Sequence, residues 1–174
     1  IDIPFSLDGT PTNSFVPPTP DVVVAIRTNI MTLQSTNATI EDQATNLRYL
    51  LHFVGDIQQP LHCSTAISAN TPNGDAGGNT FSLNGGSWGN LHALWDAGGG
   101  FLSDSLPRPL SAANQTFLSN KVTAIEANYP YVRNSGLIPN PLTWAEAGLA
   151  LAQTNAYVGI TRGTTPSQPY LNTT

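Results

Sequence analysis

Residues 51–62 read LHFVGDIQQPLH, and residues 90–96 read NLHALWD. These two stretches hold all three histidines of the chain, and two of the histidines, His52 and His92, are followed four residues later by an aspartate. Residues four apart on a helix share one face, with Cβ atoms about 5–6 Å apart, so each pair can present an imidazole nitrogen and a carboxylate oxygen to one point. The candidate ligands of a shared cation are His52, Asp56, His62, His92 and Asp96.

This donor set suits zinc. Zinc takes nitrogen and oxygen ligands at roughly 2.0–2.2 Å, and a catalytic zinc keeps one position open for water or substrate. The candidate ligands would bind one zinc ion fully, or two ions in part. The alternative is that each histidine is an ordinary residue whose imidazole is satisfied by a neighbouring aspartate. No histidine lies outside the pattern, which favours the metal site.

Helix signals surround the first stretch. Asp21 is a good N-cap for a helix to about Leu33, and the run Thr39–Asp42 resembles a capping box that opens a second helix, which ends near Ile57. Apolar residues of this second helix recur at intervals of three and four, as in a core-facing stripe. The stripe consists of Ile40, Ala44, Leu47, Leu51 and Val54. Pro60 ends the helix and places His62 just beyond it.

The remaining segments complete a mainly α protein with long loops. A short helix carries His92 and Asp96 before three glycines stop it, and helices are expected over 111–128 and 142–160, the latter opened by Pro141. The alternating piece 80–83 suggests one strand of a small β-hairpin. The length is that of a single domain over 1–174.

Composition limits the function. Charged residues make up 10% of the chain, the formal net charge is −5, and Lys121 is the one lysine. Such a chain has no basic patch to grip a phosphate backbone, so bound cations would have to attract a phosphodiester. No apolar run reaches about 18 residues, which disfavours a membrane span. Cys63, the one cysteine, cannot form a disulfide within the chain.

Three acceptor sequences for N-glycosylation occur, at Asn37, Asn114 and Asn172. A chain so rich in asparagine, serine and threonine produces such matches by chance, so they favour a secreted, extracellular glycoprotein only weakly.

The two opening stretches, with the segment GDAGGN at 74–79 between them, closely resemble the nuclease S1/P1 family of fungi and plants. Members of that family are secreted zinc-dependent single-strand nucleases related to bacterial zinc phospholipases C. The resemblance covers most of the chain. It implies the phospholipase C/P1 nuclease-like helical fold and hydrolysis of single-stranded RNA and DNA to 5′-phosphorylated products.

The resemblance also implies roles for particular residues. His62, His92 and Asp96 match the ligands of one zinc ion. His52 and Asp56 match ligands of a second, and Asp56 also matches the carboxylate that bridges to a third. The family chemistry is attack of an activated water on phosphorus, with the metal ions stabilising the developing charge.

Asp75 and Asn79 match positions that line the nucleotide site of the family. Glycines between them permit close approach of backbone to a ligand, and an asparagine amide can hydrogen-bond a nucleobase. The alternative is an ordinary turn rich in Asp, Asn and Gly.

The chain also departs from the family. The tryptophan, aspartate and two histidines that supply further zinc ligands near the start of family members have no counterpart here, and the family's helix after Tyr170 is absent. We therefore expect an incomplete, interior portion of such a nuclease, with missing N- and C-terminal segments, one complete zinc site and no activity alone. The alternative is a non-catalytic, metal-stapled extracellular structural protein derived from a nuclease.

Overall fold

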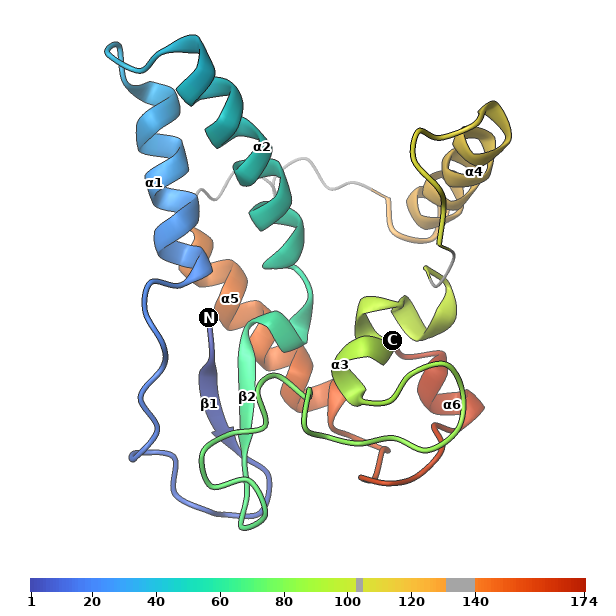
Figure 1. The fold of residues 1–174 in the computed structure, drawn as a ribbon. Helices are drawn as coiled ribbons and strands as arrows, with labels where there is room; N and C mark the ends of the chain where they lie inside the picture. Colours follow the sequence, from blue (N-terminus) through green and yellow to red (C-terminus); the bar gives the residue numbers. More distant parts are fainter. Residues whose placement is uncertain (103–104, 131–139) are drawn as a thin grey trace. The chain divides into compact units, whose positions relative to one another are not determined.

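The structure is a computed structural model of the chain (Figure 1). The described residues are 1–102, 105–130 and 140–174. They form two compact units: unit 1 comprises Ile1–Leu102 with Pro141–Thr174, and unit 2 comprises Ser103–Asn140. The mainly α fold is confirmed, whereas a single domain over 1–174 stays a prediction. In the described part of the chain, no helix combines the length and the apolar character needed to cross a membrane.

Unit 1 begins its helical part with α1 (Val22–Gln34) and α2 (Ile40–Asp56), which lie side by side (Figure 1). The Asp21 carboxylate accepts a hydrogen bond from the Val24 amide, as an N-cap does. At the start of α2, the Thr39 hydroxyl and the Asp42 side chain form a reciprocal capping box. Local side-chain chemistry therefore starts both helices where the sequence predicts.

The predicted core-facing stripe of α2 is wrong. Leu51 is 70% exposed and Ile40 is 87% exposed, and no residue of α2 is fully buried. Instead Leu50, Phe53 and Val54 pack against the apolar cluster of α1, so the packed face is turned by about one residue, or roughly 100°, from the predicted one. Only Val54 belongs to both faces.

A two-stranded sheet follows the short 3₁₀ helix η1 (Pro60–His62). Strand β2 (Ser64–Ile67) pairs in parallel with β1 (Ile3–Ser6), with Ile3 opposite Ser64. The predicted hairpin at 80–83 is wrong, because that segment contributes only an isolated bridge between Ser82 and Asn90. A parallel pair joins segments distant in sequence, so no local turn signal announces it.

The remaining helical elements of unit 1 are joined by long loops. These elements are α3 (Leu91–Asp96), η2 (Gly98–Gly100), α5 (Pro141–Leu151), the π-helical turn η4 (Ala152–Ala156) and α6 (Gln168–Leu171). Residues of α3, η4 and α6 form a second apolar cluster, whereas Ala145 of α5 belongs to the cluster of α1. Asn90 caps α3, since its side chain accepts from the Ala93 amide. The helix predicted over 142–160 is thus α5 continued by η4. The short helix α6 was not predicted from the sequence.

Unit 2 contains α4 (Ala112–Asn128), which Ser111 caps and which matches the predicted helix at 111–128. None of its residues is fully buried.

Candidate metal centre

His62 occupies a position between two apolar clusters. Its neighbour Leu61 is 1% exposed and packs with Leu91 and Leu94, whereas its other neighbour, Cys63, is fully buried in the cluster of α1. Both flanking side chains are therefore held by packing, which limits the backbone positions open to His62. Burial raises the pKa of the Cys63 thiol to about 11, and the thiol donates a hydrogen bond to the Ile57 carbonyl oxygen at 3.2 Å.

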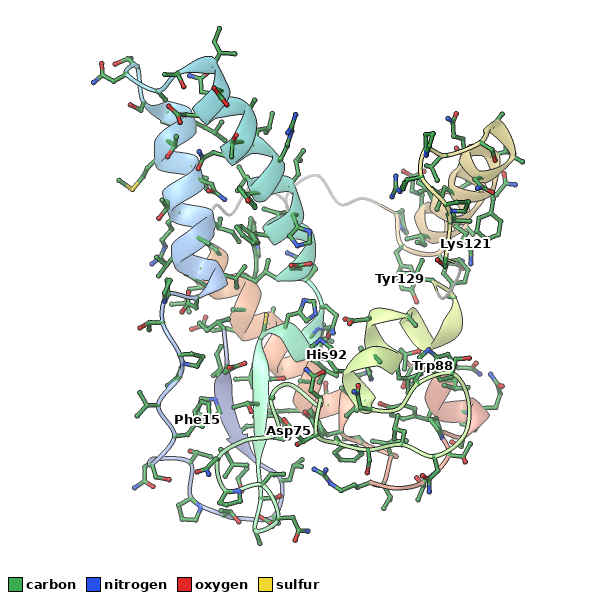
Figure 2. The ribbon with its side chains drawn as sticks, viewed as in Figure 1. Phe15, Asp75, Trp88, His92, Lys121 and Tyr129 are labelled. Carbon is green, nitrogen blue, oxygen red and sulfur yellow. The ribbon has the colours of Figure 1, made fainter. Side chains whose placement is uncertain are left out.

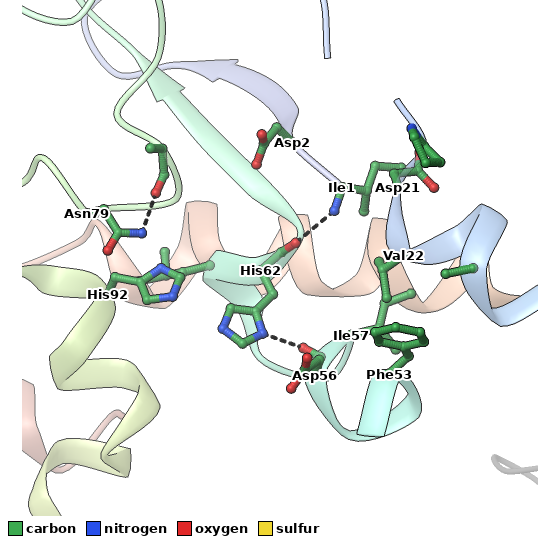
Figure 3. A pocket seen from close by; sticks show the side chains of 14 residues that line it. Ile1, Asp2, Asp21, Val22, Phe53, Asp56, Ile57, His62, Asn79 and His92 are labelled. Carbon is green, nitrogen blue, oxygen red and sulfur yellow. Dashed lines mark hydrogen bonds between the residues drawn. The ribbon is translucent and has the colours of Figure 1, made fainter. Parts of the chain in front are cut away.

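Three of the candidate ligands converge. His62 Nε2 lies 3.2 Å from Asp96 Oδ1, and His92 Nε2 lies 3.5 Å from Asp96 Oδ2. One ligand atom from each of the three residues falls within 4.8 Å of the others. The imidazole rings of His62 and His92 lie side by side, with centroids 5.0 Å apart (Figure 3). The structure thus brings η1 and α3 together around one point.

The other nitrogen of each ring is already engaged. His62 Nδ1 lies 2.9 Å from the Asp56 carbonyl oxygen, and His92 Nδ1 lies 2.8 Å from the Gly77 carbonyl oxygen. Carbonyl oxygens only accept, so each Nδ1 donates a hydrogen bond, and Nε2, which faces the Asp96 carboxylate, is the ring atom available to a metal. Backbone carbonyls commonly orient metal-binding histidines in this way. Two nitrogens and a carboxylate oxygen fit zinc.

His52 and Asp56 form a separate pair at the end of α2. His52 Nε2 lies 3.1 Å from Asp56 Oδ2, with the side chains 66% and 38% exposed. Among the described residues, neither joins a group of three ligands. Asp56 nevertheless lies next to the converging ligands, because its carbonyl oxygen accepts from His62.

A pocket of about 570 Å³ opens beside the ligands (Figure 3). His62, His92 and Asp56 form part of its wall, and apolar side chains, including Phe53 and Ile57, form another part. The pocket therefore combines candidate metal ligands with an apolar surface, as small-molecule sites commonly do.

Asn79 and Asp75 are only four residues apart in sequence, but they differ in their access to the pocket. Asn79 lines the pocket, and its amide donates to the Ala76 carbonyl oxygen at 2.8 Å. Asp75 is fully buried, and its carboxylate accepts from the Ala66 amide at 2.9 Å and from the Tyr157 hydroxyl at 2.7 Å. The prediction that Asp75 contacts substrate is therefore not supported by the structure, because its carboxylate does not reach the pocket.

Two supporting residues went unnoticed in the sequence. The Gln59 amide donates to Asp96 Oδ1 at 2.9 Å, and the Gly77 carbonyl orients His92. Gln59 is also the N-cap of η1, a role that its place before Pro60 could have indicated. No sequence signal marks the Gly77 carbonyl, since any residue has one.

Comparison with known proteins identifies the family of the chain. The family model for S1/P1 Nuclease matches residues 6–174. Endonuclease 4 of Arabidopsis thaliana is 31% identical to the chain over an alignment of 134 positions, and the alignment covers 71% of this chain and 41% of the relative. The chain thus spans less than half the length of this curated relative. With the family model matched over nearly all its residues, the chain belongs to the S1/P1 nuclease family.

Proposed function

We propose that the chain supplies the His62, His92 and Asp96 centre of a zinc-dependent nuclease that cleaves single-stranded RNA and DNA to 5′-phosphorylated products. The observation that carries this proposal is the convergence of three ligand atoms within 4.8 Å, with both Nδ1 atoms already engaged by carbonyls. Family membership supports phosphodiester hydrolysis, and the similar relative from Arabidopsis thaliana is an endonuclease by name.

Each residue has a distinct task in this proposal. His62 and His92 present Nε2, and Asp96 presents a carboxylate that the Gln59 amide holds in place. Asn79 has a second amide hydrogen that can donate to a phosphate oxygen or a base edge in the pocket. When bound, zinc supplies Lewis acidity, which polarises the phosphodiester and makes water a better nucleophile.

His52 and Asp56 are proposed as ligands of a second zinc ion, with Asp56 shared toward a third. Asp56 lines the same pocket as His62 and His92, which supports this assignment. The low positive charge of the chain also supports it. With six lysines and arginines against eleven acidic residues, the chain offers a polyanion little attraction, and several zinc ions would supply it.

The decisive experiment uses the product of the complete gene. Purified protein is incubated with single-stranded RNA and DNA, with and without EDTA, and the product ends are identified. We expect cleavage to 5′-phosphates that EDTA abolishes and added zinc restores. Cleavage that survives exhaustive chelation would overturn the zinc mechanism. Stoichiometric zinc binding without any cleavage would overturn the nuclease function and support the structural alternative.

We also propose that the protein is secreted and glycosylated at Asn37, Asn114 and Asn172. Asn37 and Asn172 are exposed, which is compatible with a glycan, and Asn114 is half-buried in α4. Removal of N-glycans from the protein isolated from its own source should lower its mass. An unchanged mass would contradict glycosylation at these positions.

A further inference from the structure

Asp75 is a buried carboxylate that the proposed hydrolysis does not use. It lies inside unit 1, while His92 faces the pocket; Figure 2 labels both side chains. Its two oxygens accept hydrogen bonds from the Ala66 amide, at the middle of β2, and from the Tyr157 hydroxyl, at the end of η4. A buried carboxylate is costly unless it is hydrogen-bonded, so these two contacts specify where Asp75 can lie.

Tyr157 is a well-fixed donor. Its ring packs edge-on against Phe5, with centroids 5.2 Å apart, and against Phe81, with centroids 5.7 Å apart. Burial, and next the charge of Asp75, raise the pKa of Tyr157 well above its usual value, so the hydroxyl keeps its proton and donates a hydrogen bond to Asp75. The aromatic contacts and the hydrogen bond together hold the Asp75 carboxylate in one place.

Asp75 in turn holds the loop that orients His92. The Asp75 carbonyl oxygen accepts from the Thr80 amide at 3.1 Å and from the Thr80 hydroxyl at 3.3 Å, which closes the loop on itself. Inside this closed loop, the Gly77 carbonyl oxygen accepts from His92 Nδ1 at 2.8 Å. Gly77 has φ +60°, and a Cβ there would lie 2.3 Å from the Leu61 carbonyl oxygen, so the backbone passes too closely for any side chain.

We infer that the Asp75–Tyr157 hydrogen bond is a positioning device for the proposed metal site: by fixing the loop that carries Gly77, it holds the His92 ring with Nδ1 on the Gly77 carbonyl oxygen and Nε2 toward Asp96. Asp75 and Tyr157 are positioning residues and touch neither metal nor substrate. The inference depends on the proposed metal site for its purpose, but its physical content, the hydrogen bond from His92 Nδ1 to the Gly77 carbonyl oxygen, is measurable through the His92 tautomer without any metal.

The test uses the full chain in its metal-free state. In Tyr157→Phe, ¹⁵N chemical shifts of the neutral His92 ring should show a loss of the Nδ1-protonated tautomer that predominates in the unmodified chain. Zinc titration against a chromophoric chelator should show affinity lowered by about 10-fold, in the range typical of lost outer-shell contacts to a metal ligand.

Tyr170→Phe is the matched control. Tyr170 is also a buried tyrosine, and its hydroxyl donates to the Ala156 carbonyl oxygen at 2.6 Å and accepts from Trp95 at 2.8 Å, without touching the loop. Loss of the Tyr170 hydroxyl should lower the free energy of unfolding about as much as Tyr157→Phe does, and it should leave the His92 tautomer unchanged. An equal tautomer change in both variants would show general loosening and overturn the inference.

An unchanged His92 tautomer in Tyr157→Phe would also overturn it. Should Tyr157→Phe fail to fold, Asp75→Asn takes its place, because asparagine retains one acceptor for the Ala66 amide and loses the charged acceptor of Tyr157. Absence of nuclease activity combined with the expected tautomer change would reject the proposed function and leave the positioning role standing.

Discussion

The chain contains two His-x₃-Asp pairs with the same helical spacing, but the pairs differ in exposure and in the residues around them. His92 and Asp96 meet a third ligand, His62, and His92 is 19% exposed with its Nδ1 bound to a carbonyl. His52 and Asp56 lie at the end of α2, His52 is 66% exposed, and among the described residues no third ligand joins them. Equal spacing therefore does not produce equal sites.

The difference lies in what surrounds each pair. The Gly77 carbonyl and the Gln59 amide hold His92 and Asp96, and both come from segments outside α3. Metal affinity depends on such preorganisation, since an unheld ligand loses conformational entropy when it binds. Four expected outcomes, in decreasing order of effect, test this comparison.

Removing one ligand from each pair should have the largest and most unequal effect. We expect His92→Ala to lower zinc affinity of the chain by about 1,000-fold, or roughly 4 kcal/mol, because it removes one of three converging ligands. His52→Ala, the matched control, should leave this zinc bound. Elemental analysis after dialysis against buffered zinc gives the stoichiometry. Unchanged zinc content in His92→Ala would break the assignment.

Closing the space at Gly77 should destabilise the region around His92. Gly77→Ala forces a Cβ to within 2.3 Å of the Leu61 carbonyl oxygen at φ +60°, so we expect a loss of about 3 kcal/mol in the free energy of unfolding. Gly163 has φ +74° with nothing within 4 Å of its Cβ position, so Gly163→Ala should cost only about 1 kcal/mol. Denaturant unfolding measures both, and equal losses would mean that backbone strain alone matters.

Removing the hydrogen bond that holds Asp96 should have a smaller effect on zinc affinity. In Gln59→Ala the amide that donates to Asp96 Oδ1 is lost, and zinc affinity should fall by about 10-fold. The exposed neighbour Gln58 provides the control, because Gln58→Ala should bind zinc as the unmodified chain does. If both variants bind zinc equally, Gln59 does not support the site.

The smallest effect is expected beside the exposed pair. Leu51 precedes His52 on α2 and is 70% exposed, so Leu51→Ser should change the free energy of unfolding by no more than about 0.5 kcal/mol. Thermal and denaturant unfolding of the chain provide the measurement. A loss above about 1 kcal/mol would show that this face of α2 is covered in solution, and the contrast in exposure between the two pairs would then fail.

Features that depend on contacts between residues close in sequence could be predicted, whereas features that depend on distant residues could not. Asp21 and Thr39 cap helices through contacts within three residues, and the sequence predicts both caps. The pairing of Ile3 with Ser64 and the bond from Gln59 to Asp96 join residues far apart in sequence, and no local pattern indicates either. The same limit explains Asp75: its match to a family position implied a place in the nucleotide site, but its burial depends on what the fold places over it.

The sequence by itself determined the helices that carry the candidate ligands and the chemistry of those ligands, because hydrogen-bonded caps and a spacing of four residues act within one helical turn. Only the tertiary structure decided which histidine–aspartate pair gains a third partner. Packing of Leu61 against Leu91 and Leu94 brings η1 against α3 and sets His62 beside Asp96. Burial of apolar surface between distant segments drives that approach, and its outcome depends on the whole of unit 1 rather than on any one motif.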